Sequence, residues 1–210
     1  MRLEDLFCNH VQPETKLSPD DISREVTEAY LGHLKAEADR YRCDADALDR
    51  VLGGADHFID IANSCYEYAV NGRLNTANLG IQDDNWLDFA SFINQARWDE
   101  EFHSANSLAL GLEKLFKLGA IRARLDLDTL GEAAHKALPT VLQGEECGYL
   151  TLSEVAVLAQ MNEKSVRNAT QPIAPDRLNT RKQGTRTVVD SHEALRWLKG
   201  RRNFNPSVFV

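Results

Sequence analysis

The chain has 210 residues, 43% of them hydrophobic and 27% charged, and its 24 Lys and Arg against 32 Asp and Glu give a net charge of −8. This length fits one large domain or two small ones, and the composition excludes a disordered chain, a membrane-spanning protein and, with four scattered cysteines, a disulfide-stabilised secreted domain. The N-terminus lacks the apolar segment of a secretory signal, so we expect a cytoplasmic protein without a membrane partner.

The charge divides the chain into two parts. Residues 147–210 carry ten basic and five acidic side chains, a net charge of +5, whereas residues 1–146 carry 14 basic and 27 acidic ones, a net charge of −13. Parts of opposite charge are expected to have different partners. Polar residues 143–146 precede the change of sign. The predicted organisation is therefore an acidic domain over 1–146, a basic domain over 147–202 and a tail over 203–210, frayed or packed back on the protein.

Apolar residues at helical spacing predict an all-helical bundle for the acidic part, because no strand-like alternation competes with them. A hydroxyl or carboxylate can accept from the free backbone N–H groups of a first helical turn, and Pro fits that turn. On these signals the expected helices begin at Ser18-Pro19, Asp44, just before Phe58, at Asp83-Asp84, near Leu108 and at Asp128. The expected breaks are Gly53-Gly54, Asn71-Gly72 with a loop over 72–82, and Gly119.

The basic part begins with two short predicted helices. Thr151 or Ser153 can cap the first helix, in which the small Ala156 allows a second helix to cross closely. A polar turn follows, with Met161 as its buried apolar residue, and the second helix begins near Glu163 and buries Val166. This is the spacing of a helix-turn-helix.

A hairpin and a last helix complete the pattern. Residues 178–189 have apolar or β-branched arms around a polar turn that contains Gly184, which predicts a β-hairpin. Asp190 and Ser191 then cap a helix that carries Trp197 and Leu198 on its apolar side. The expected fold class is mostly α: an N-terminal helical bundle followed by a small winged helix-turn-helix with a β-hairpin.

About 50 residues of this segment resemble a known family. Residues 150–156 (LTLSEVA), 165–167 (SVR), 184–186 (GTR) and 193–198 (EALRWL) are similar to the excisionase/MerR-type DNA-binding module. The resemblance implies a recognition helix in the major groove and a wing against the DNA backbone or minor groove. The chain departs from the family at Gln160, where the family usually has a turn glycine, and in a longer connection between Ala169 and Leu178.

The residue types at these positions suit DNA independently of the resemblance. The first residues of a recognition helix contact base edges. Here Arg167 can form two hydrogen bonds to guanine, and Asn168 can form two to adenine. Basic and polar hairpin residues suit phosphates and the minor groove, and Arg201 and Arg202 can add backbone contacts. The candidate DNA-binding residues are Glu163, Lys164, Ser165, Arg167 and Asn168 on the helix and Arg181, Lys182, Gln183, Thr185 and Arg186 on the hairpin.

The function expected from the sequence is sequence-specific binding of double-stranded DNA by a transcriptional regulator of bacterial, phage or mobile-element origin. One module contacts only about one half-site, so we expect a homodimer with the bundle as its dimerisation domain. The bundle's aromatic residues are expected mainly in its core; they are Trp86, Phe89, Phe92, Trp98 and Phe102. The alternatives are an excisionase-like factor that bends DNA and a protein–protein adaptor that uses the acidic bundle.

No pattern points to an enzyme, because the sequence has no Gly-rich phosphate loop, nucleophile elbow or HExxH motif. Glu100-x-x-His103 and Glu132-x-x-His135 have the spacing of di-metal helix bundles. Chance matches of this spacing are common in a chain rich in Glu and His, so we expect neither a metal site nor a cofactor.

Overall fold

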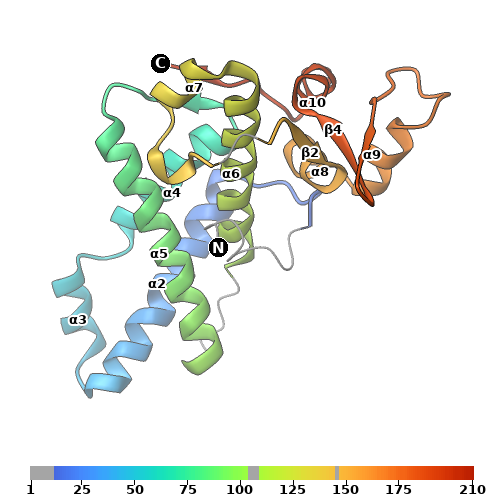
Figure 1. Cartoon of the computed structure of the whole chain (residues 1–210). Coiled ribbons are helices and arrows are strands. Elements are labelled where there is room, and N and C mark those ends of the chain that lie inside the picture. The colour runs from blue at the N-terminus through green and yellow to red at the C-terminus, as the bar shows by residue number, and fades with distance from the viewer. Residues whose placement is uncertain (1–11, 104–108, 145–146) are drawn as a thin grey trace.

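The computed structural model describes residues 12–103, 109–144 and 147–210 (Figure 1). Within these ranges the protein is mostly helical and has two small β-sheets. No helix in these ranges has the length and hydropathy that crossing a bilayer requires. The α-helices are α2 (Pro19–Tyr41), α3 (Ala45–Leu52), α4 (Asp56–Ala69), α5 (Leu79–His103), α6 (Leu110–Leu130), α7 (Glu132–Ala137), α8 (Leu152–Ala159), α9 (Glu163–Ala169) and α10 (Ser191–Leu198). The strands are β1 (Arg73–Leu74), β2 (Tyr149–Thr151), β3 (Arg181–Gln183), β4 (Arg186–Asp190) and β5 (Val208–Phe209).

Helices α2, α4, α5 and α6 pack together and form what we call the bundle, with α3 at one end and α7 at the other (Figure 1). Trp86 of α5 lies at the centre of its core, fully buried, with edge contacts to the rings of Tyr68 and Phe116. The expectation that the aromatic residues lie mainly in the core is met by Trp86 and Phe89, whereas Trp98 and Phe102 are 54% and 57% exposed. They lie on the last turns of α5, which extend beyond the start of α6 (Figure 1).

The predicted starts of the first two helices are confirmed. The Ser18 hydroxyl accepts a 3.1 Å hydrogen bond from the Asp21 backbone, with Pro19 in the first turn of α2. Asp44 caps α3 in the same way through the Ala47 N–H, and α3 ends at Gly53 in the left-handed conformation. These signals are local, so the sequence alone identifies them.

The predicted break at Gly119 and the predicted helix start at Asp128 are both wrong, because α6 runs unbroken from Leu110 to Leu130. Gly119 lies against the ring of Trp86, and a Cβ at this position would come 2.9 Å from the Cζ3 atom of that ring and closer still to its tip. Glycine is therefore required here by a close helix–helix contact and does not end the helix. The expected loop over 72–82 is also shorter than predicted, since α5 begins at Leu79.

The C-terminal residues 204–210 pack back on the bundle. Val208 and Phe209 of β5 pair in parallel with β1, and the Phe204 ring is buried beside Arg122 of α6. The tail passes so close to Gly72 that a Cβ there would lie 2.8 Å from the Asn205 carbonyl oxygen. The prediction of an all-helical domain over 1–146 missed β1, because two residues cannot show an alternating pattern.

Residues 147–203, which we call the C-terminal module, contain a three-stranded sheet in the order β2-β4-β3 and the helices α8, α9 and α10. Helices α8 and α10 pack on α6, and α9 lies on the side away from the bundle (Figure 1). Polar contacts of Arg124 and Asp128 join the module to α6, and they include a 3.0 Å hydrogen bond from the Cys147 N–H to Asp128. Arg124 forms an ion pair with Glu154 of α8, and Asp128 accepts a 2.5 Å hydrogen bond from the Ser191 hydroxyl at the start of α10.

Candidate nucleic-acid interface

Helix α8 supports the rest of the candidate site. Thr151 and Glu154 form a capping box, in which each side chain accepts from the backbone N–H of the other residue. The helix is eight residues long, and six of its side chains are buried, among them Val155 and Ala156 at 0% exposure. Gln160 ends it in the left-handed conformation, with φ of 48° and ψ of 48°. The chain thus makes with glutamine a turn for which the sequence analysis expected glycine in the family it resembles.

Helix α9 presents its polar residues to solvent. The Asn162 side chain caps it by accepting from the Lys164 N–H at 2.8 Å. Val166 is fully buried, and the partly buried Met161 packs against the same core. The exposed side chains of α9 are those of Lys164, Ser165, Arg167 and Asn168. The Arg167 guanidinium bonds the Glu163 carboxylate at 2.7 Å, one helical turn away, and the Arg167 side chain is 64% exposed.

Strands β3 and β4 form the predicted hairpin, with Gln183 paired to Arg186 across a two-residue turn at Gly184 and Thr185. Gly184 has φ of +59°, a conformation that glycine adopts without strain. Val188 and Val189 of β4 are fully buried and anchor the hairpin. The five predicted hairpin residues are all exposed; they are Arg181, Lys182, Gln183, Thr185 and Arg186.

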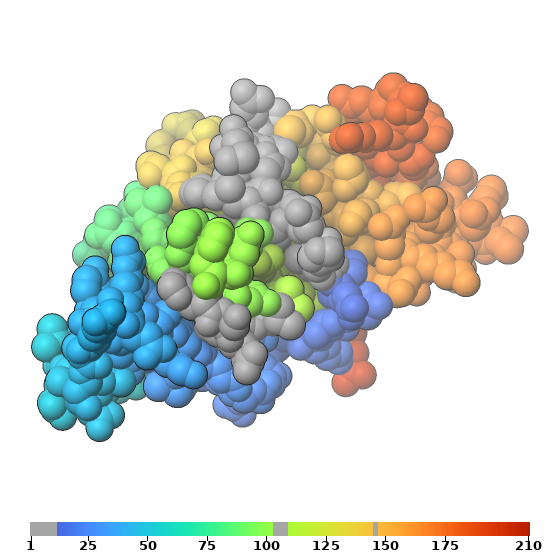
Figure 2. All heavy atoms as spheres, turned by 90° about the horizontal axis from the view of Figure 1, so that it is seen from below, coloured from blue at the N-terminus to red at the C-terminus, as the bar shows by residue number. Residues whose placement is uncertain are grey.

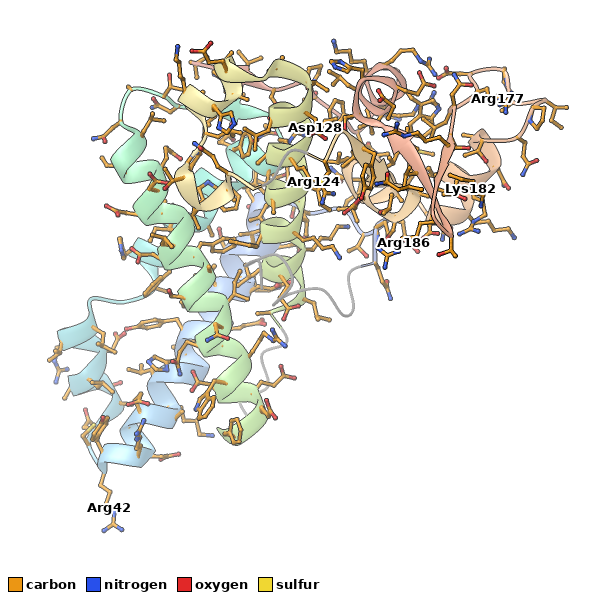
Figure 3. The ribbon with its side chains drawn as sticks, viewed as in Figure 1. Arg42, Arg124, Asp128, Arg177, Lys182 and Arg186 are labelled. Atoms are coloured by element: carbon orange, nitrogen blue, oxygen red, sulfur yellow. The ribbon has the colours of Figure 1, made fainter. Side chains whose placement is uncertain are left out.

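The helix and the hairpin lie at the same end of the molecule, remote from α3. Figure 1 shows the hairpin turn beside α9, and Figure 2 shows residues of both elements, coloured orange to red, projecting together from the side opposite α2 and α3. Lys182 and Arg186 are labelled on the hairpin in Figure 3, next to α9. The Lys182 ammonium donates to the Thr187 hydroxyl at 2.9 Å, which holds the lysine along the hairpin surface.

The residues between α9 and the hairpin form a loop that is anchored by α10. The Asp176 carboxylate pairs with Arg196 at 2.8 Å and also with Arg201, whose guanidinium stacks 4.1 Å from the centroid of the Trp197 ring. Arg196 also bonds Glu193, and this hydrogen bond lowers the pKa of the Glu193 carboxyl to about 2. Arg201, which the sequence suggested could add contacts to the DNA backbone, thus holds the loop through Asp176.

The same loop carries an exposed cation that the sequence analysis did not include among the site residues. Arg177 donates to the Thr170 carbonyl oxygen at 3.3 Å and remains exposed, at the upper end of the module in Figure 3. Ile173, in the same loop, is 93% exposed. No sequence signal identified either residue, because the loop has no periodic pattern and its position depends on the Asp176 ion pairs.

The two Glu-x-x-His pairs lie at opposite ends of the bundle: Glu100 and His103 fall at the end of α5, whereas Glu132 and His135 are on α7 (Figure 1). They cannot form one di-metal centre. Glu132 pairs with Lys136, and His135 contacts Gln143. Within the described ranges, no group of three or more His, Cys, Asp or Glu side chains has the arrangement of a metal site.

Comparison of the chain with models of known protein families, with curated proteins and with solved structures finds no match.

Proposed function

We propose that the C-terminal module is a winged helix-turn-helix that binds double-stranded DNA, and that the protein is a transcriptional regulator that acts as a homodimer. One observation carries the proposal. The ten candidate side chains lie on α9 and on the neighbouring hairpin. Nine of these side chains are exposed, and the tenth, that of Glu163, is partly exposed. Buried Val166 and Val188 fix α9 and the hairpin from beneath, so the polar side chains are presented without disturbing the core.

Charge on this surface suits a polyanion. Lys164, Arg167, Arg181, Lys182 and Arg186 are exposed there, and Glu163 is the acidic member of the candidate set. Phosphates attract such a surface regardless of sequence, and the acidic bundle repels them. DNA is therefore expected to approach the module from the side away from the bundle.

Sequence readout is assigned to α9. A helix fits the major groove, and exposed Arg167 and Asn168 have the donor and acceptor patterns that match guanine and adenine. To reach a base, Arg167 must exchange its bond with Glu163 for one with guanine. An exposed ion pair of this kind contributes only about 0.2–1 kcal/mol, so the exchange costs little.

The proposal is tested by the salt dependence of binding. Fluorescence anisotropy with random and genomic duplexes should show binding by the full-length protein. If a dimer neutralises about 6–8 phosphates, log K should fall against log salt concentration with a slope of about −5 to −7. Arg181→Ala/Arg186→Ala should weaken binding to every duplex, whereas Lys35→Ala, which removes an exposed charge from α2, should leave it unchanged. Binding to no duplex at low salt would refute the proposal.

A further inference from the structure

The bundle contains a cavity of about 450 Å³ between α2, α4 and α5, on the side where α3 lies. This volume falls in the range of small-molecule sites. The lining residues all lie outside the C-terminal module and come from α2, α4 and α5, with Leu52 from the end of α3 and Gly54 from the turn that follows it.

The cavity has apolar walls and one loosely packed side. Phe58 and Phe92 stack with ring centroids 4.6 Å apart, and the small side chains of Ala29 and Ala96 leave room beside them. Leu52, the last residue of α3, lines the cavity and is 49% exposed. Helix α3, described over its whole length, has no buried side chain. A flat apolar or aromatic ligand could pack against Phe58 and Phe92, and α3, which lies beside the cavity, buries no side chain of its own.

Three polar side chains of the lining already donate one hydrogen bond each to the protein. The Tyr30 hydroxyl donates to Asp49 at 2.7 Å, and the Ser91 hydroxyl donates to the Leu87 carbonyl oxygen at 2.9 Å. The Gln95 amide nitrogen donates to Asp99 at 3.1 Å. Each hydroxyl has used its single hydrogen and can only accept from a ligand, whereas the Gln95 amide keeps a second N–H and its carbonyl oxygen.

The ionisable side chains of the lining are those of His33, His57 and Asp88. His33 Nδ1 lies 2.9 Å from a carboxylate oxygen of Asp99, and Asp99 is only 1% exposed. This contact occupies Nδ1, so a ligand can meet the His33 ring only at Nε2. Asp88 adds an exposed carboxylate at the rim. Among the lining residues that the structure describes, the second amide N–H of Gln95 and a ring N–H of His57 remain as side-chain donors.

We propose that this cavity binds a small cation with an aromatic or apolar body, such as an aromatic amine or amidine. The lining has more free acceptors than donors and therefore favours a ligand that brings donors, and the Asp88 carboxylate favours positive charge. The net charge of −13 in residues 1–146 disfavours anions at the same place. The proposal concerns the bundle alone and holds whether or not the module binds DNA.

The test uses two probes of similar size and opposite charge, tryptamine and indole-3-propionate, in calorimetric titrations of the full-length protein. Tryptamine should bind at least about tenfold more tightly than the anion. Asp88→Asn, at an exposed position, should weaken tryptamine binding several-fold. Binding of neither probe, or equal binding of both, would overturn the proposal.

Ser91→Trp locates the binding. It places a large side chain in the cavity from an exposed position on α5, and Asn94→Trp, at an exposed position of the same helix outside the lining, is the matched control. Tryptamine binding should be lost in the first variant and kept in the second, with both folded by circular dichroism. Unchanged tryptamine affinity in a folded Ser91→Trp variant would place any binding elsewhere and reject the cavity.

Discussion

Arg124 of α6 and Glu154 of α8 form an ion pair that joins the bundle to the C-terminal module. The Arg124 side chain is 9% exposed and that of Glu154 is 22% exposed, and Glu154 also accepts from the Thr151 N–H at 2.7 Å. One carboxylate thus closes the capping box of α8 and fixes that helix against α6. The orientation of the candidate DNA-binding surface relative to the bundle depends on this contact and on the bond between Asp128 and Ser191 (Figure 3).

The first prediction concerns the pH dependence of this ion pair. Burial raises the pKa of the Glu154 carboxyl, but Arg124 and the hydrogen bonds from Thr151 lower it more, so the pKa lies below its ordinary value of 4.5. The unfolded chain then takes up the proton first as pH falls. The stability that Glu154 contributes is present above about pH 4.5 and is lost as pH falls through the lowered pKa.

Glu154→Gln measures that contribution. It keeps an acceptor for the Thr151 N–H but leaves the Arg124 charge without its counter-ion, so it should lower the free energy of unfolding by about 3 kcal/mol at pH 7. In urea unfolding, the difference from wild type should shrink at pH 3.5. Glu163→Gln, which breaks only an exposed pair, should cost less than about 1 kcal/mol. An equal effect of Glu154→Gln at both pH values would contradict the prediction.

The second prediction concerns Arg122, which is 1% exposed. Its guanidinium donates to the Ala69 and Val70 carbonyl oxygens at the end of α4 and to the Asn205 carbonyl oxygen of the tail, at 2.9, 3.4 and 2.7 Å. Arg122→Met removes these donors from buried acceptors and should destabilise the protein by about 3–5 kcal/mol.

The loss should also release the tail. Amide hydrogen exchange over residues 204–210 of Arg122→Met should become faster relative to the rest of the chain. Arg73→Met removes an exposed arginine from β1 and is the matched control, with a change within about 0.5 kcal/mol. Unaltered protection of the tail in Arg122→Met would show that β1 pairing and Phe204 hold it without the arginine.

A third prediction follows from the contact between Gly119 and Trp86. Gly119→Ala introduces a methyl group that overlaps the buried indole, so Trp86 or α6 must shift, at a cost of about 1–3 kcal/mol. At an ordinary helix position the same substitution stabilises. Gly80→Ala, in the first turn of α5 with only Asn78 nearby, should therefore raise the free energy of unfolding by about 0.5–1 kcal/mol. Thermal and urea unfolding of both variants should give effects of opposite sign.

The fourth prediction separates sequence readout from phosphate binding under the proposed function. Arg167→Ala should weaken the best duplex by about 1–3 kcal/mol and random duplexes much less, because a bidentate contact to guanine is lost. Lys182→Ala should weaken all duplexes about equally and reduce the magnitude of the salt slope by about one. A uniform loss in Arg167→Ala would assign that residue to the backbone and move readout elsewhere on α9.

Local signals in the sequence identified much of the secondary structure. The caps at Ser18 and Asp44, the hairpin turn at Gly184 and the buried positions Val155 and Val166 were predicted because each depends on a few neighbouring residues. Gly119 misled the prediction for the same reason. Judged from its neighbours in the sequence alone, a glycine in a helical segment indicates a helix end. Only the packing of Trp86, which belongs to another helix, against Gly119 shows that this glycine is required inside the helix.

Some features of the candidate site likewise follow from the sequence alone, and others only from the tertiary structure. The sequence determined which residues of α9 and the hairpin are polar and which are apolar, and hence which side of each element faces solvent. Tertiary structure decided that Arg201 is held by Asp176 and Trp197 while Arg177 remains exposed, that the tail returns to Gly72, and that α2, α4 and α5 enclose a cavity. These features join residues far apart in the chain, and their energies come from packing and ion pairing that no periodicity of neighbouring residues encodes.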